Sequence, residues 1–264
     1  MQRSRMMPDL HLGGNLGEIL SRMARVALDI SSPVAILRTI YWRTRYVTWV
    51  ARRSLGLTPM QGVLTELARR GIRVGSLVAL EVFGGSGTDH TKDYSSRVSS
   101  LEVWEIDQRK EAALKRNLRG AKVKITDSYS EVKKTTGRYS FIVVDDPGGI
   151  YDGHVEHYDI FPDLFRICAN SSILVINVFS DFESSDLRFV SSADRDLILS
   201  RRKSFYRTDI PEFVPFERMI EAYEDIVQSN GFHLEWCFFH KRPMWNVPQT
   251  SAVHYLTMKV TRRV

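Results

Sequence analysis

Cysteine is scarce in this sequence: only Cys168 and Cys237 occur in 264 residues. Two thiols allow at most one disulfide, which excludes a disulfide framework and any zinc site built mainly from thiolates. Scarce cysteine is typical of a reducing compartment, so we expect a cytoplasmic location. The basic residues at the start of the chain are not followed by an apolar segment, so we expect no secretory signal there.

Long apolar runs, internal repeats and Gly/Ser-rich or Pro-rich linkers are also missing from the sequence. No apolar run approaches the roughly 18 to 20 residues that a membrane-spanning helix requires. With 43% hydrophobic, 26% charged and 11% aromatic residues, the composition excludes the disordered, collagen-like and low-complexity classes. The length is that of one globular domain with a short appendage.

Positive charge is concentrated near the N-terminus. Residues 1–60 contain nine Arg, no Lys and three acidic residues, which accounts for the whole formal net charge of +6. The remainder of the chain is therefore neutral. A neutral body with a basic arm is suited to an anionic partner.

Residues 1–75 are expected to form a helical extension that carries this charge. Apolar spacings of three and four predict helices over 16–30 and 59–70, and Ser32-Pro33 predicts the start of another that runs to Arg53. Helix 33–53 has an arginine stripe and an aromatic stripe, namely Arg38, Arg45 and Arg52 and Trp42, Tyr46 and Trp49. Such a helix binds nucleic acid or an anionic membrane, or else packs its aromatic stripe on the body or on a second subunit.

From residue 76 onward, short apolar runs alternate with helical stretches. Strands are predicted at 77–83, 101–106, 122–126, 139–144 and 172–178, with a final antiparallel pair at 232–239 and 252–260. Helices are predicted at 108–118, 157–167 and 214–229, and a long insertion at 180–212. The alternation predicts an α/β domain over 76–264 with a doubly wound, mainly parallel seven-stranded sheet. Ligands of such sheets bind outside the carboxyl ends of the strands, near the point where strand order reverses.

The first predicted strand ends in a glycine-rich turn, Glu81-Val-Phe-Gly84-Gly85-Ser86-Gly87-Thr88. Glycines let the backbone approach a ligand and leave amides free at a helix start. A dinucleotide fingerprint would need a third glycine where His90 stands, and it does not normally place an acid just before the glycines. The turn instead resembles the first motif of the class I S-adenosylmethionine-dependent methyltransferases, an acid and a spacer followed by Gly-x-Gly.

The resemblance continues at the ends of the next strands and implies S-adenosylmethionine as cofactor. Glu105 closes the second strand, where the family places an acid on the ribose hydroxyls, although Asp107 competes for this role. The Asp of Thr126-Asp127-Ser128 matches the position that reads adenine, unless it simply caps a turn. Glu81 has a structural alternative as well, a pair with a cationic side chain. The implied cofactor-binding residues are Glu81, Gly84, Gly85, Gly87, Glu105, Ile106, Asp127, Ser128 and Asp145.

Asp145-Asp146-Pro147-Gly148 occupies the place of the family's fourth motif, with Asp145 beside the transferred methyl group. Enzymes that methylate base amines usually carry Asp/Asn-Pro-Pro-aromatic there, so the missing ring argues against this acceptor unless Tyr151 supplies a stacking surface. Catechol-type relatives bind magnesium with acids after strands four and five. Here Asp145 and Asn177 fit, but Ile176 replaces the other acid, and we expect no metal.

His154 and His157 lie just beyond the fourth motif and, with Asp145, are the candidate catalytic residues. A histidine can take a proton from an acceptor hydroxyl because its unperturbed pKa lies near neutrality. The alternative is that these histidines and Glu156 cap the helix predicted to start near residue 157.

The predicted insertion contains a second basic and aromatic stretch, residues 201–207, in the region where this family often builds a lid over the acceptor. Together with residues 33–53, it suggests an anionic acceptor, a nucleic acid or an anionic membrane surface. The sequence therefore predicts methyl transfer from S-adenosylmethionine to an oxygen or nitrogen of an unidentified acceptor. The alternatives are a methyltransferase specific for RNA or DNA and a catalytically silent binding subunit.

Overall fold

The computed structural model describes residues 47–146, 149–182, 191–242 and 253–263, together with Tyr41 and Thr44. The chain divides into two compact units, residues 1–48 and Trp49–Val264. The predicted helix 16–30 and most of the predicted helix 33–53 lie outside the described residues, whereas residues 49–54 at the end of the latter are helical.

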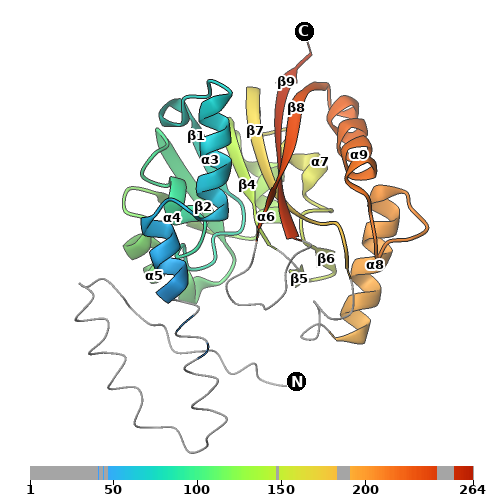
Figure 1. Ribbon diagram of the computed structural model, residues 1–264, viewed down its shortest axis with the longest axis horizontal. Helices are drawn as coiled ribbons and strands as arrows, with labels where there is room; N and C mark the ends of the chain where they lie inside the picture. Colours follow the sequence, from blue (N-terminus) through green and yellow to red (C-terminus); the bar gives the residue numbers. More distant parts are fainter. Residues whose placement is uncertain are drawn as a thin grey trace, which may run out of the picture. The chain divides into compact units, whose positions relative to one another are not determined.

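A seven-stranded sheet forms the centre of the larger unit (Figure 1). Its parallel strands are β1 (Val78–Glu81), β2 (Ser100–Glu105), β3 (Lys122–Ile125), β4 (Tyr139–Val144) and β7 (Cys168–Phe179). The antiparallel strands are β8 (Phe232–Lys241) and β9 (Val253–Arg262). The strand order β3-β2-β1-β4-β7-β9-β8 reverses between β1 and β4. The predicted fold class is thus confirmed, including the antiparallel pair.

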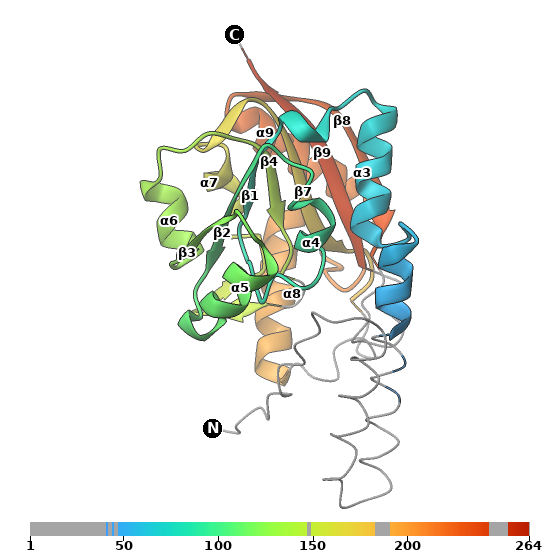
Figure 2. The same cartoon turned by 90° about the vertical axis from the view of Figure 1, so that its left-hand side faces the viewer.

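Helices cover both faces of the sheet (Figures 1 and 2). One face carries α3 (Pro59–Arg69), α4 (Thr91–Tyr94) and α5 (Glu111–Asn117), and the other carries α6 (Ser128–Lys134), α7 (Phe161–Leu164), α8 (Ser192–Tyr206) and α9 (Phe216–Ser229). Side chains alternate between the faces along each strand. In β1, for example, Ala79 belongs to the hydrophobic cluster on the α3 face and Leu80 to the cluster on the opposite face.

Helix α3 is part of the same packed unit as the sheet. It begins with a capping box, in which Thr58 Oγ1 accepts from Gln61 N and Gln61 Oε1 accepts from Thr58 N. Val63 and Leu67, four residues apart, are fully buried in the cluster that also contains Ala79. The segment 59–70, which the sequence assigns to the extension, therefore supports the first strand of the sheet.

Three segments differ from the predicted elements. The predicted helix 157–167 shortens to α7, because Pro162 lacks the amide proton that a helix running from residue 157 would need. A hairpin of β5 (Ile150–Tyr151) and β6 (His154–Val155) precedes it. The predicted insertion contains α8, whose fully buried positions Ile198, Arg202 and Tyr206 lie four residues apart. The predicted helix 108–118 divides into the 3₁₀ helix η3 (Gln108–Lys110) and α5, and a further 3₁₀ turn, η2 (Val74–Ser76), precedes β1.

Two further findings concern membranes and thiols. Within the described ranges, no helix combines the length and apolar character needed to cross a membrane. Cys168 is a buried free thiol and Cys237 a partly buried one, so the single disulfide that the composition allows is not formed.

Candidate functional site

The glycine turn leads from β1 to α4 at the point where strand order reverses. Gly85 and Gly87 have φ values of +55° and +68°, a conformation that favours glycine. A Cβ atom at Gly87 would lie 2.7 Å from Leu118 Cδ1, and one at Gly84 would lie 2.3 Å from Val103 Cγ1, so both glycines permit close packing of the turn. A Cβ atom at Gly85 would meet no atom within 4 Å. Gly85 is therefore the glycine of the turn that faces open space.

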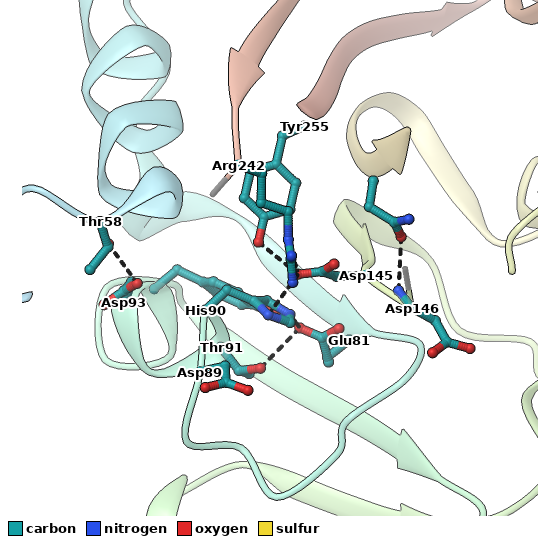
Figure 3. A network of polar contacts seen from close by, with 12 residues as sticks. Thr58, Glu81, Asp89, His90, Thr91, Asp93, Asp145, Asp146, Arg242 and Tyr255 are labelled. Atoms are coloured by element: carbon teal, nitrogen blue, oxygen red, sulfur yellow. Dashed lines mark hydrogen bonds and ion pairs between the residues drawn. The ribbon is translucent and has the colours of Figure 1, made fainter. Parts of the chain in front are cut away.

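Glu81, the last residue of β1, is fully buried. Its Oε2 atom accepts hydrogen bonds from His90 Nε2 at 2.9 Å, Thr91 Oγ1 at 3.1 Å and Tyr94 OH at 2.5 Å (Figure 3). Its Oε1 atom is also buried and has no hydrogen-bond partner among the described residues. Oε2 of Glu81 thus forms the pair with a cationic side chain that was the structural alternative for this residue. Oε1 of Glu81 remains unused by the described residues.

Asp145 follows β4 and lies across His90 from Glu81 (Figure 3). Its Oδ2 atom accepts from Arg242 Nε and Nη2 at 3.0 and 2.9 Å and from Tyr255 OH at 2.6 Å, while its buried Oδ1 atom has no hydrogen-bond partner in the described part of the chain. Burial alone would raise the pKa of Asp145. The charges of Arg242 and His90 outweigh this effect and hold the pKa well below its usual range.

His90 connects the two buried carboxylates. Its Nε2 atom lies 2.9 Å from Glu81 Oε2 and its Nδ1 atom 2.8 Å from Asp145 Oδ2. Burial alone would lower the pKa of His90, but the negative charges of Glu81 and Asp145 raise it well above its ordinary value. The imidazole is therefore charged at neutral pH. Two carboxylates, His90 and Arg242 then form a cluster whose charges balance.

Asp146 points away from this cluster (Figure 3). Its backbone N donates to Asn177 Oδ1 at 2.8 Å. Burial and the neighbouring charge of Asp145 raise the pKa of the Asp146 side chain to about 6. Asn177 and Asp145, the two residues considered for magnesium, are thus engaged by a backbone amide and by Arg242. The described residues contain no group of three or more His, Cys, Asp or Glu arranged to hold a metal ion.

The two acids at the end of β2 are used differently. Glu105 is 6% exposed, and its Oε1 atom accepts from Asp107 N at 2.9 Å and from Lys110 Nζ at 3.3 Å. The carboxylate of Asp107 accepts from the Arg109 guanidinium through both oxygens, and these hydrogen bonds lower the pKa of Asp107 to about 2. Ile106, between them, is 40% exposed. The geometry favours Glu105 over Asp107 as the acid that can receive a ligand beside an uncovered apolar side chain.

Asp127 is the N-cap of α6. Its Oδ1 atom accepts from Tyr129 N and its Oδ2 atom from Ser130 N, both at 3.2 Å. Ser128 Oγ donates to Val82 O at 2.5 Å and ties α6 to the residue after β1. The capping role that the sequence left open for Asp127 is thus present. An adenine-reading role would have to use the remaining acceptor capacity of the same carboxylate.

His154 and His157 lie in contrasting surroundings. His154 belongs to the β5–β6 hairpin, where its partly exposed ring stacks on Tyr129 with 3.9 Å between ring centroids. His157 is fully buried, and its Nε2 atom shares a short hydrogen bond with Tyr223 OH. Burial, assisted by the charge of Arg202, lowers the pKa of His157 to about 3. His157 is therefore a neutral core residue that could reach an acceptor only if the core opened.

The basic stretch 201–207 is largely engaged within the fold. Arg202 is fully buried, and it donates to Pro211 O and Phe179 O at 2.7 and 3.0 Å. Arg201 Nη1 lies 3.5 Å from Asp159, and the other basic residues of the stretch have partners too: Lys203 pairs with Asp209 and Arg207 with Asp225. Arg202 is thus unavailable to an anionic partner, whereas the side chains of Lys203 and Arg207 are 58% and 71% exposed.

Sequence reasoning does not identify His90, Arg242 and Tyr255 as site residues. His90 stands out only as the position where a dinucleotide fingerprint would need glycine. Arg242 and Tyr255 lie 97 and 110 residues from Asp145 in the chain, and they reach it through the β8–β9 hairpin. Local sequence pattern carries no signal for contacts at that separation.

No model of a known protein family matches the sequence, and no curated protein matches it. Solved structures resemble the fold at low identity. Magnesium protoporphyrin IX methyltransferase from Synechocystis PCC 6803, with SAH bound, is 11% identical with a TM-score of 0.47 over 92% of this chain and 94% of that one. M. jannaschii TYW2 in complex with AdoMet is 14% identical with a TM-score of 0.45 over 77% of each chain. N-methyltransferase NodS from Bradyrhizobium japonicum is 13% identical with a TM-score of 0.45 over 76% of this chain and 94% of that one. At this level of identity and TM-score, the likenesses carry no argument about function. Any functional inference depends on the residues of the site.

Proposed function

We propose that this protein is a class I S-adenosylmethionine-dependent methyltransferase that acts on an oxygen or nitrogen of an unidentified acceptor. The observation that carries the proposal is the arrangement at the strand-order reversal. There the glycine turn, with open space beside Gly85, leads from Glu81 to His90, and His90 joins Glu81 to Asp145; each of these two buried carboxylates has one oxygen that no described residue uses. When bound, S-adenosylmethionine supplies an electrophilic methyl group on a positively charged sulfonium.

The charge of the strand ends favours this cofactor over a dinucleotide. Four carboxylates lie at the carboxyl ends of β1, β2 and β4, namely those of Glu81, Glu105, Asp145 and Asp146. The unused oxygens of Glu81 and Asp145 can accept hydrogen bonds from an ammonium group. A pyrophosphate would find no hydrogen-bond donor in these unused carboxylate oxygens, because an ionised carboxylate only accepts.

The end of β2 fits the nucleoside part. A carboxylate can accept from two neighbouring hydroxyls at once, and Glu105 is the acid of this strand end that is not committed to an arginine. The exposed apolar side chain of Ile106 can cover one face of adenine. Gly85 leaves room for the methionine part, and Asp127 lies at the adenine-reading position implied by the family resemblance.

Two carboxylates at the end of β4 take separate roles in this proposal. Asp145 stays ionised because Arg242 and His90 lower its pKa, so it orients groups beside the methyl but is a poor proton acceptor. Asp146 has a pKa of about 6, which suits a group that accepts a proton from an acceptor near neutral pH. His154, partly exposed on the hairpin that follows, is the second candidate for this proton.

Isothermal titration with S-adenosylhomocysteine tests the proposal. We expect micromolar binding by the wild-type chain and its loss in Glu105→Ala. Asp107→Ala is the matched control, two residues away, and should retain binding because Asp107 is engaged by Arg109. No heat from the wild type, or loss of binding in the control but not in Glu105→Ala, would contradict the assignment.

The acceptor requires a separate experiment. Incubation of the protein and S-adenosylmethionine with a lysate from its own source should add the mass of one methyl group to a component. Binding of the cofactor without any such product, even with partner proteins present, would favour the silent subunit. A cytoplasmic location is part of the proposal and is supported by the two free thiols.

A further inference from the structure

Arg53, in the helical segment 49–54 before α3, reaches the glycine turn. Its Nη1 atom donates to Thr88 O at 2.9 Å and its Nη2 atom to Asp89 O at 2.5 Å. Its Nε atom donates to Asp93 Oδ1 at 2.7 Å. Each of the three guanidinium nitrogens therefore has an acceptor, two on the backbone of the turn and one on α4.

Asp93 extends this connection to the start of α3. Its side chain is 0% exposed, and its second oxygen accepts from Thr58 Oγ1, the N-cap of α3, at 2.7 Å (Figure 3). Gln61 Nε2 in turn donates to Arg53 O at 3.0 Å. A fully buried carboxylate is stable only with such partners. The segment before α3, the start of α3 and α4 thus form one hydrogen-bonded unit.

Other elements also hold the turn. Asn117, the last residue of α5, donates from Nδ2 to Ser86 O at 2.8 Å. His90, which follows the turn, is held by Glu81. Gly85 directly precedes these attachments, which begin at Ser86, and has a positive φ with no neighbour in the direction of a Cβ. The shape of the turn after Gly85 therefore depends on contacts from several elements, and Arg53 supplies those from the segment before α3.

We propose that Arg53 is a positioning residue for the cofactor, which holds the glycine turn and α4 in the shape that receives the methionine part. The inference rests on the proposed function, because it takes the glycine turn as the cofactor's binding surface. If Arg53 has this role, the helical segment 49–54 that carries it is a component of the cofactor site. Lysine cannot replace Arg53 fully, because one ammonium group cannot present a planar fork to three separate acceptors.

Titration of the full chain with S-adenosylhomocysteine, comparing wild type with Arg53→Lys and Arg53→Ala, tests this role. We expect the dissociation constant to rise roughly tenfold in Arg53→Lys, and further in Arg53→Ala, as charge-assisted contacts to the turn are lost. Arg52→Ala, at the exposed neighbouring arginine, is the matched control and should bind like the wild type. Arg53→Lys keeps a positive charge beside buried Asp93, so it is the variant expected to fold normally.

Amide hydrogen exchange on the same variants separates positioning from general stability. We expect faster exchange in residues 84–93 of the Arg53 variants and unchanged exchange in α9, on the opposite face of the sheet. Wild-type affinity in both Arg53 variants would overturn the inference, as would weaker binding accompanied by faster exchange throughout the sheet. If the wild type itself does not bind S-adenosylhomocysteine, the proposed function fails. Exchange in residues 84–93 then still shows whether Arg53 holds the turn.

Discussion

Replacement of Arg242 by methionine should remove the main partner of the buried Asp145 carboxylate. The Asp145 side chain is 0% exposed and takes two hydrogen bonds from Arg242, which is itself only 13% exposed. Breaking a buried ion pair by removing one partner costs about 3 to 5 kcal/mol. Because Tyr255 and His90 stay beside the same oxygen, we expect the lower end, a loss of about 3 kcal/mol in the free energy of unfolding.

Urea denaturation followed by circular dichroism measures this loss from the shift in midpoint at an unchanged slope. The double variant Asp145→Asn/Arg242→Met no longer buries an uncompensated charge. It should therefore be more stable than the sum of the two single effects predicts, by at least about 1.5 kcal/mol.

The matched control is Lys259→Met, at an ion pair with Glu235 in which the two side chains are 23% and 33% exposed. Partly exposed pairs of this kind contribute less than about 1 kcal/mol. A loss in Arg242→Met no larger than in this control, or additive effects of Asp145→Asn and Arg242→Met, would refute the reasoning that Arg242 holds Asp145.

Two pH dependences follow from the same region. The pKa of His90 is raised well above 6.5, so its contribution to stability should be complete below about pH 6.5 and be lost as pH rises through that higher pKa. His90→Gln should flatten the alkaline limb of the stability curve measured by urea titration, and an unchanged limb would contradict the charged state of His90. The pKa of Asp146 is raised to about 6, so the native state binds the extra proton, and stability should fall by about 2 kcal/mol between about pH 4 and pH 6. Asp146→Asn should remove that decline, and its persistence would show that Asp146 has an ordinary pKa.

The sheet is the part of the fold that local sequence predicts best. β1, β2 and β4 are short apolar runs with a glycine or an aspartate soon after them, so their positions follow from neighbouring residues alone. α8 is missed because one of its three buried positions is Arg202, which makes the core-facing side of the helix look polar. The predicted helix over 157–167 overlooks Pro162, which sets the start of α7.

The candidate site is predictable only where its chemistry lies at strand ends. Parallel strands bring their carboxyl ends to one edge, so Glu81, Glu105 and Asp145 can be placed together from strand order alone. The partners of these carboxylates cannot be placed in this way, because Arg242 is 97 residues from Asp145 and meets it through a hairpin. Arg53 is similarly 40 residues from Asp93 and pairs with it only because α3 packs beside α4. Long-range pairing of this kind depends on the completed packing of the domain.

The position of β9 between β7 and β8 has a consequence for the order of events on the ribosome. β7 is translated long before β9, and until β9 arrives the apolar edge of β7 has no neighbour on that side. An unpaired edge of this kind can pair with another chain, so a nascent protein stalled before residue 253 would be prone to aggregate. Such a stalled protein would also lack the Tyr255 hydroxyl that Asp145 requires. Translation through the β8–β9 hairpin therefore both closes the sheet and supplies Arg242 and Tyr255, which donate hydrogen bonds to Asp145.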